Sequence, residues 1–134
     1  ALDLRTGQRK WHYQYIHHGI WDMDNPCAPL LVDLTINGRT VKAVAQPTKQ
    51  AFMYVLNRET GEPIWPIVEK PVEKGDVPSE WYSPTQPFPT KPPAFARQGV
   101  SINELIDFLD ADADRGGFGA VGAVAGAAFR LRLG

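Results

Sequence analysis

The sequence is poor in cysteine and has no excess of charge of either sign, and both absences limit what the chain can be. Its single cysteine, Cys27, has no second thiol to pair with inside the chain, so an internal disulfide is excluded. The cysteine content therefore does not indicate whether the protein works in an oxidising or a reducing compartment. Lys and Arg number 14 against 15 Asp and Glu, which leaves a formal charge of −1. That balance gives no electrostatic reason to expect nucleic acid or an anionic membrane as a partner.

Long apolar runs are also missing, and the first residue is Ala1 rather than Met. We find no signal peptide, transit peptide or transmembrane stretch, although an address segment of a longer protein would lie upstream of Ala1. Proline and glycine, in contrast, are plentiful: Pro is concentrated from Pro63 to Pro93, and Gly from Gly116 to Gly134. Both residue types interrupt long helices, so the sequence predicts strands and loops over most of its length.

A nine-residue pattern occurs twice, and every position of the second copy lies 54 residues after its counterpart. The copies are Asp3-x-x-Thr6-Gly7-x-x-x-Trp11 and Asn57-x-x-Thr60-Gly61-x-x-x-Trp65. Each copy predicts a strand, a tight turn and a second strand, because Asp or Asn bonds the N–H groups ahead of it and Gly supplies a positive φ. The Trp then follows on the outgoing strand, where its ring can fill the gap between neighbouring sheets.

The residues between the two copies predict more strands. Ala28–Ile36 and Thr40–Ala45 flank Asn37-Gly38, a strong hairpin signal, and Ala51–Asn57 leads into the second turn. Four strands per 54 residues predict a β-propeller blade with one long loop. Such units must stack, because a blade cannot bury both of its faces alone. An open antiparallel sandwich is the alternative.

Both the repeats and the residues between them resemble the quinoprotein alcohol and glucose dehydrogenases, β-propellers that hold pyrroloquinoline quinone (PQQ) and usually Ca²⁺. The repeats are similar to the tryptophan-docking motifs of that family, although other propellers carry similar units. Two segments resemble it more specifically: His17-His18-Gly19-Ile20-Trp21-Asp22-Met23-Asp24, and the strand that runs from Gln46 to Arg58. The resemblance covers residues 1–109 and implies that Asp22 is the catalytic carboxylate and that Lys49 contacts the quinone.

Alcohol oxidation by hydride transfer requires these residue types. A carboxylate near the alcohol accepts the hydroxyl proton as the C–H bond breaks, and it does so better where partial burial raises its pKa. An ammonium such as that of Lys49 stabilises the charge that develops on the quinone carbonyl. Asp24 competes with Asp22 for the role of base. Judged without the family segment, Asp22 is a loop carboxylate and Lys49 a solvated lysine.

No metal-binding residue is predicted within this chain. His17 and His18 are adjacent, and neighbours on a strand point to opposite faces, so the pair is not expected to bind a metal. With one cysteine and no further ligand at useful spacing, a zinc site is not expected either. The resemblance implies PQQ and Ca²⁺ as cofactors, with the main Ca²⁺ ligands outside this chain.

The resemblance also implies partners and a location. The expected partners are a sugar or alcohol substrate, a quinone or cytochrome electron acceptor, and the remaining propeller blades. The expected location is the periplasm, with a parent protein that is soluble or membrane-associated. We expect the chain to be a fragment of about two blades that is inactive alone. The alternative function is a non-catalytic β-propeller scaffold, which would have no need for a base at Asp22 paired with a lysine at Lys49.

The expected domain organisation has two parts. Residues 1–109 form the partial propeller, and they include a Pro-rich connection (63–98) that we expect to be an ordered loop over the propeller. Read alone, this connection also fits a ligand for a Pro-recognition domain. A capping box at Ser101-Ile102-Asn103-Glu104 predicts a short helix through Leu109. Residues 110–134 are Gly/Ala-rich with little to bury, which predicts a flexible or non-native tail.

Overall fold

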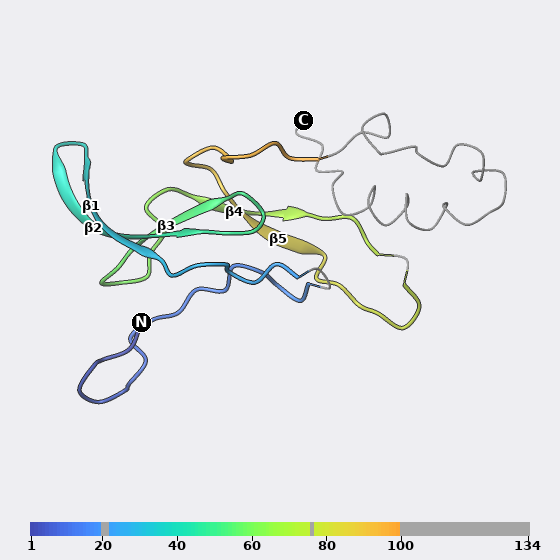
Figure 1. The fold of residues 1–134 in the computed structure, drawn as a ribbon, viewed down its shortest axis with the longest axis horizontal. Helices are drawn as coiled ribbons and strands as arrows, with labels where there is room; N and C mark the ends of the chain where they lie inside the picture. Colours follow the sequence, from blue (N-terminus) through green and yellow to red (C-terminus); the bar gives the residue numbers. More distant parts are fainter. Residues whose placement is uncertain (20–21, 76, 100–134) are drawn as a thin grey trace.

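The computed structural model describes residues 1–19, 22–75 and 77–99. Within these ranges it contains strands and no helix, so there is no helix there that could cross a membrane. The strands are β1 (Leu30–Ile36), β2 (Arg39–Pro47), β3 (Met53–Asn57), β4 (Ile67–Pro71) and β5 (Thr85–Pro89). β1, β2 and β3 form one antiparallel sheet in that order, and β4 pairs with β5 in a second (Figure 1). The predicted all-β class is confirmed for this part of the chain, whereas the predicted helix and tail after residue 100 lie outside it.

The predicted hairpin between β1 and β2 is confirmed. Asn37 and Gly38 have φ values of 50° and 73°, the left-handed conformation that both central residues of a type I′ turn adopt. Ile36 therefore pairs with Arg39, and the register continues to Leu30 opposite Ala45. The third predicted run forms β3, which pairs with the far end of β2.

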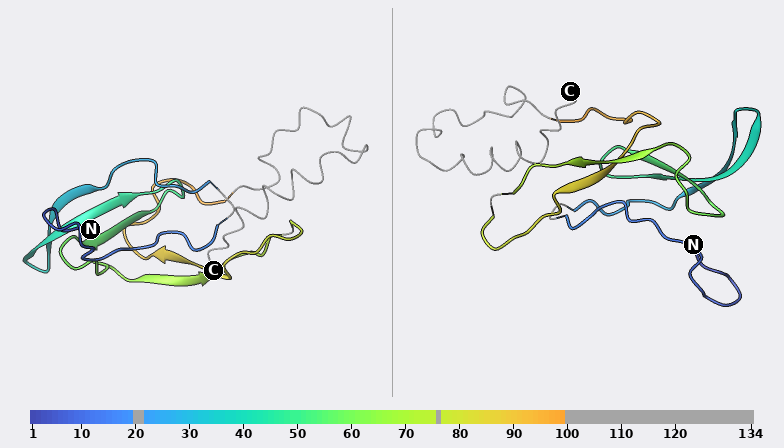
Figure 2. Two further views of the ribbon diagram at one scale, coloured as in Figure 1. Left: turned by 90° about the horizontal axis from the view of Figure 1, so that it is seen from below. Right: turned by 180° about the vertical axis from the view of Figure 1, so that it is seen from behind.

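The core is a cluster of aromatic side chains drawn from both sheets. Phe52, Tyr54 and Phe88 are buried, and Tyr13 and Tyr15 pack against them. Tyr54 is fully buried and donates a hydrogen bond of 2.8 Å from its hydroxyl to the carbonyl oxygen of Pro87. The left view of Figure 2 shows the two sheets as two layers, with residues 11–19 running along them. Burial of Tyr54 raises the pKa of its hydroxyl, which therefore stays neutral and keeps donating.

The Pro-rich connection is not a loop throughout, contrary to the prediction. β4 and β5 lie within Pro63 to Pro93 and pair with each other. Just beyond the two strands, Thr90 N donates a hydrogen bond of 3.0 Å to Pro66 O. In an antiparallel pair every second residue pair is hydrogen-bonded, so the bonded pairs of β4 and β5 follow at every second position from Thr90. The prolines within the two strands lie at the positions in between, where the backbone N–H and C=O groups point away from the partner strand. These prolines are Pro71, Pro87 and Pro89. Proline is therefore tolerated in this sheet, since no ladder bond is lost.

Both predicted turns of the repeat form, but neither Trp11 nor Trp65 lies on a strand that leaves its turn, and β4 begins only at Ile67. Asp3 and Asn57 each accept backbone N–H bonds from the residues two and three positions ahead. Backbone hydrogen bonds close both turns, and each turn is followed by a single isolated bridge, Leu2 with Arg9 and Leu56 with Pro63. The larger sheet in the described part of the chain consequently has three strands, not the four predicted for a blade.

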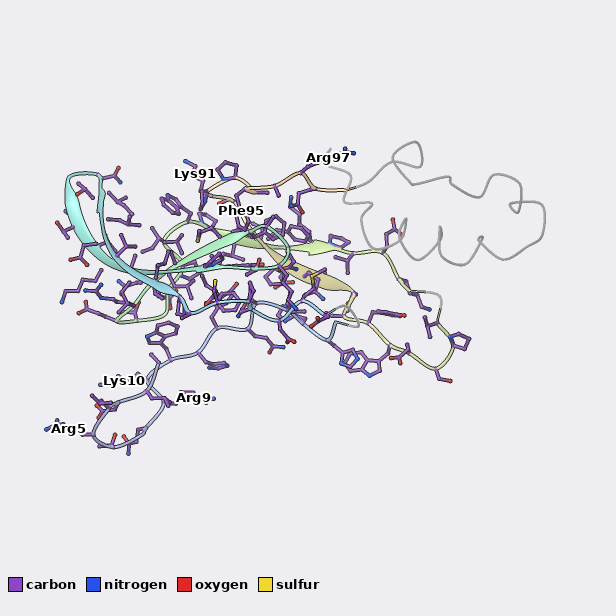
Figure 3. The ribbon with its side chains drawn as sticks, viewed as in Figure 1. Arg5, Arg9, Lys10, Lys91, Phe95 and Arg97 are labelled. Carbon is purple, nitrogen blue, oxygen red and sulfur yellow. The ribbon has the colours of Figure 1, made fainter. Side chains whose placement is uncertain are left out.

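Trp11 joins the two copies of the repeat. Its indole Nε1 donates a hydrogen bond of 3.0 Å to the carbonyl oxygen of Arg58, in the turn of the second copy. The ring also lies flat against Gly61, where an added Cβ would be 2.7 Å from the indole. The turn of the first copy projects away from the sheets and carries Arg5 at its tip (Figure 3). The ring of one copy thus packs on the turn of the next.

Comparison of Gly61→Ala with Gly7→Ala tests this contact. Both glycines have positive φ, 83° and 70°, so alanine is strained at either position, but only at Gly61 does the new methyl group meet the indole. We expect Gly7→Ala to destabilise the chain by about 1 kcal/mol, from backbone strain alone. We expect Gly61→Ala to cost about 2–4 kcal/mol, because overpacking adds to the strain. Urea unfolding followed by tryptophan fluorescence measures both, and equal losses would argue against the contact.

Candidate functional site

Lys49 lies in the tight turn that connects β2 to β3. Thr48 N donates to the carbonyl oxygen of Phe52 and Ala51 N to that of Thr48, both at 3.0 Å, which closes the turn. Ala51 adopts a φ of 63°, so the chain reverses sharply after Lys49. The Lys49 side chain is 36% exposed, which leaves its ammonium accessible at the end of the sheet.

The segment that follows β5 supports this turn from the other side. Phe95 N donates to Ala51 O at 2.9 Å, and the Gln98 side-chain amide donates to Gln50 O at 3.0 Å. Figure 3 shows Phe95 on the segment that follows β5. The side-chain oxygen of Gln50, the next residue in the turn, is buried and has no hydrogen-bond partner among the described residues.

Asp22 comes within ion-pair distance of Lys49. Its Oδ2 lies 2.9 Å from Lys49 Nζ, although the two residues are 27 positions apart. The side chain of Asp22 is 81% exposed. A hydrogen bond from Lys49, one with the side chain of Asp24 and the charge of Lys49 together lower the pKa of Asp22. Burial does not raise this pKa, because the carboxylate is solvated and has a cation as its neighbour.

The other candidate residues near Asp22 have separate partners. Asp24 contributes to the lowered pKa of Asp22, so this competing carboxylate lies near it. His17 Nε2 lies 2.8 Å from a carboxylate oxygen of Glu69, and the ring of His18 stacks on Trp81 at 3.4 Å between centroids. Within the described ranges, no three His, Cys, Asp or Glu side chains are grouped so that they could hold a metal ion.

Two glutamines that the sequence interpretation did not single out hold the chain on either side of Asp22. Gln86 binds the backbone of His17, and Gln46 binds the carbonyl oxygen of Cys27. Both glutamines precede a proline, which restricts them to an extended backbone conformation. The Gln-Pro dipeptide is the one feature of the sequence that could have drawn attention to these glutamines. The distant residues to which their side chains bind are not evident from the sequence.

The pKa of Asp22 gives a direct test of its pairing with Lys49. Lys49→Gln is expected to bring this pKa back toward its ordinary value of about 3.9, whereas Lys42→Gln, which breaks the exposed pair with Glu59, should not change it. Because the folded pKa is lowered, the stabilisation by the pair is present above about pH 4 and is lost as the pH falls through the folded value. The measurement is a carboxyl ¹³C NMR titration. An Asp22 that titrates identically with and without Lys49 would contradict the pairing.

Comparison with known proteins assigns the chain to a protein family. A family model described as the PQQ glucose/ethanol/alcohol dehydrogenase β-propeller domain matches residues 1–116. The quinoprotein glucose dehydrogenases of Escherichia coli and Gluconobacter oxydans are 44% and 48% identical over 88 residues, or 66% and 65% of this chain. The quinate/shikimate dehydrogenase (quinone) of Acinetobacter baylyi is 40% identical over 106 residues, or 78% of the chain.

The chain spans only 11–13% of the length of these relatives. No solved structure matches it.

Proposed function

Because the chain belongs to the family of the PQQ glucose/ethanol/alcohol dehydrogenase β-propeller domain, we propose that it forms part of the active-site wall of a dehydrogenase that oxidises a sugar or other alcohol. Membership of this family implies the use of PQQ. One observation carries the proposal: the Asp22 carboxylate lies 2.9 Å from the Lys49 ammonium at an open end of the sheet. A base and a cation side by side are what alcohol oxidation requires of the protein.

The residues around Lys49 fit a quinone. The Lys49 ammonium has three N–H donors, and the ion pair with Asp22 occupies only one of them, so a carbonyl oxygen of the cofactor can accept another. The buried side-chain oxygen of Gln50, which has no partner among the described residues, is a further acceptor in this turn. When bound, PQQ takes up the hydride from the alcohol carbon, which is the redox step that no side chain supplies.

In this proposal Asp22 takes the proton of the substrate hydroxyl. The carboxylate is ionised at neutral pH and has a free lone pair for the proton, although its lowered pKa makes it a weaker base than an isolated aspartate. Lys49 orients the carboxylate and adds positive charge where negative charge develops. Asp24, beside it, is proposed to position Asp22 and not to act as the base itself.

The finer features implied by the family remain part of the proposal. We propose four-stranded blades completed by further chain segments, with the two repeats as tryptophan-docking motifs; the packing of Trp11 on Gly61 supports the latter. We further propose a quinone or cytochrome electron acceptor, Ca²⁺ bound outside this chain, and a periplasmic location. Residues 1–109 would form the propeller part and residues 110–134 a separate tail.

A chimeric enzyme tests the proposed function. In the Escherichia coli quinoprotein glucose dehydrogenase, the 88-residue segment that matches this chain is replaced by the corresponding residues of the chain. We expect the chimera to bind PQQ and oxidise glucose. The 134-residue chain alone is expected to do neither, since the sheets of three and two strands in its described part supply only one sector of a site built by several blades. A folded chimera that binds no PQQ would favour the non-catalytic scaffold.

A further inference from the structure

The chain is anchored at equal distances on either side of Asp22. His17 lies five residues before it and Cys27 five residues after it, and a glutamine side chain binds the backbone at each of these points. Five residues span at most about 18 Å even when fully extended. Fixing both ends therefore limits how far Asp22 can move from Lys49.

The anchor at His17 uses both ends of one amide. Gln86 Oε1 accepts a hydrogen bond of 2.8 Å from His17 N, and Gln86 Nε2 donates one of 2.6 Å to His17 O. The His17 ring adds a contact of 2.8 Å to Glu69, on the strand paired with that of Gln86. Both backbone groups of His17 are thereby hydrogen-bonded, as they would be in a sheet, although His17 belongs to no strand.

The anchor at Cys27 belongs to the strand that leads to Lys49. Gln46 lies near the end of β2, three residues before Lys49, and its side chain is almost fully buried. Its Nε2 donates to the carbonyl oxygens of Cys27 at 3.0 Å and Pro47 at 2.8 Å. This amide ties the chain after Asp22 directly to the strand before Lys49.

We propose that Gln86 and Gln46 are positioning residues that keep Asp22 within ion-pair distance of Lys49 by holding the backbone at His17 and Cys27. The geometric part of this inference stands on the contacts alone. Its catalytic consequence rests on the proposed function, because a displaced Asp22 affects turnover only if Asp22 is the base. Misplacing a reacting group by about 1 Å can cost up to 100-fold in rate.

The test measures the pKa of Asp22 by carboxyl ¹³C NMR in the full chain. We expect Gln86→Ala to raise this pKa toward its ordinary value, because Asp22 is no longer held beside Lys49. Gln14→Ala is the matched control: Gln14 also donates its amide to the backbone of this segment, at Ile16 O (2.9 Å), but makes no contact across the fold through that bond. A Gln86→Ala chain that folds and keeps the lowered pKa of Asp22 overturns the proposal.

Two further variants keep the test decisive if Gln86→Ala does not fold. Gln86→Glu retains the acceptor for His17 N but has no donor for His17 O, so an intermediate rise in the pKa of Asp22 is expected. Gln46→Met fills the same volume without its two donated bonds, and it should raise this pKa through the other anchor. If neither substitution moves the pKa of Asp22, the two glutamines do not position it.

The chimera separates this inference from the proposed function. With Gln86→Ala, kcat for glucose should fall about 10- to 100-fold with little change in KM, and Gln14→Ala should leave both unchanged. A chimera that is inactive with the native segment would sink the proposed function and leave the NMR result standing. An active native chimera combined with an Asp22 pKa that Gln86→Ala does not change would overturn only the positioning role.

Discussion

Asp22→Asn is expected to reduce kcat of the chimeric dehydrogenase by about 10²- to 10⁴-fold, the usual contribution of a positioned general base. Asparagine has nearly the same shape, but it cannot accept the hydroxyl proton. Lys49 would lose its charge partner and keep its position in the turn that connects β2 to β3. Steady-state oxidation of glucose measures the loss, and PQQ titration of the same variant shows whether the cofactor still binds.

Two other aspartates serve as comparisons for this result. Asp33 lies on β1, and its carboxylate is 3.1 Å from the guanidinium of Arg58, which follows β3. Asp33→Asn is expected to leave kcat unchanged. Asp24→Asn removes the competing carboxylate but leaves Asp22 paired with Lys49, so a loss of less than about tenfold is expected, well below the range for a general base. If Asp24→Asn has the large effect and Asp22→Asn the small one, the base has been assigned to the wrong carboxylate.

Tyr54→Ala is expected to lower the free energy of unfolding by about 3–5 kcal/mol, as for other large aromatic residues in a core. Tyr54 is fully buried, and its ring contacts those of Tyr15 and Phe52, with centroids 4.8 and 6.5 Å away. These contacts connect β3 with residues that precede it in the chain. Urea unfolding of the full chain, monitored by circular dichroism, gives the difference.

The hydroxyl of Tyr54 is tested separately from its ring. Tyr54→Phe keeps the aromatic packing and leaves the carbonyl oxygen of Pro87 without its 2.8 Å donor, so a smaller loss of about 1–3 kcal/mol is expected. Tyr15→Phe is the control, because its hydroxyl has no hydrogen-bond partner in the described ranges, and its effect should stay within about 0.5 kcal/mol. Equal effects of the two substitutions would show that the bond to Pro87 does not link the sheets.

Much of the candidate site could be predicted from short segments of sequence. Asp22 and Lys49 were assigned by the segments around them, and the structure brings their side chains together. The segments did not predict the electrostatic setting of Asp22, whose carboxylate is exposed and whose pKa is lowered. Burial depends on how distant segments pack, and a local motif does not contain that information.

The sequence by itself determined the local features of this protein. Asn37-Gly38 defined the hairpin and its register, because a type I′ turn requires positive φ at both positions. The two nine-residue copies likewise defined two turns, each opened by an Asp or Asn side chain.

Only the tertiary structure decided how these parts meet. Gln86 reaches the backbone of His17 across 69 positions, and Trp11 reaches Arg58 across 47. The Pro-rich connection can form a sheet because the prolines within β4 and β5 fall on positions whose backbone groups point away from the partner, in a register that exists only once the two strands have paired. A turn is stabilised within a few residues, so its sequence suffices to predict it. A contact between distant segments depends on the loops that close and the surfaces that are buried together, and these belong to the folded chain.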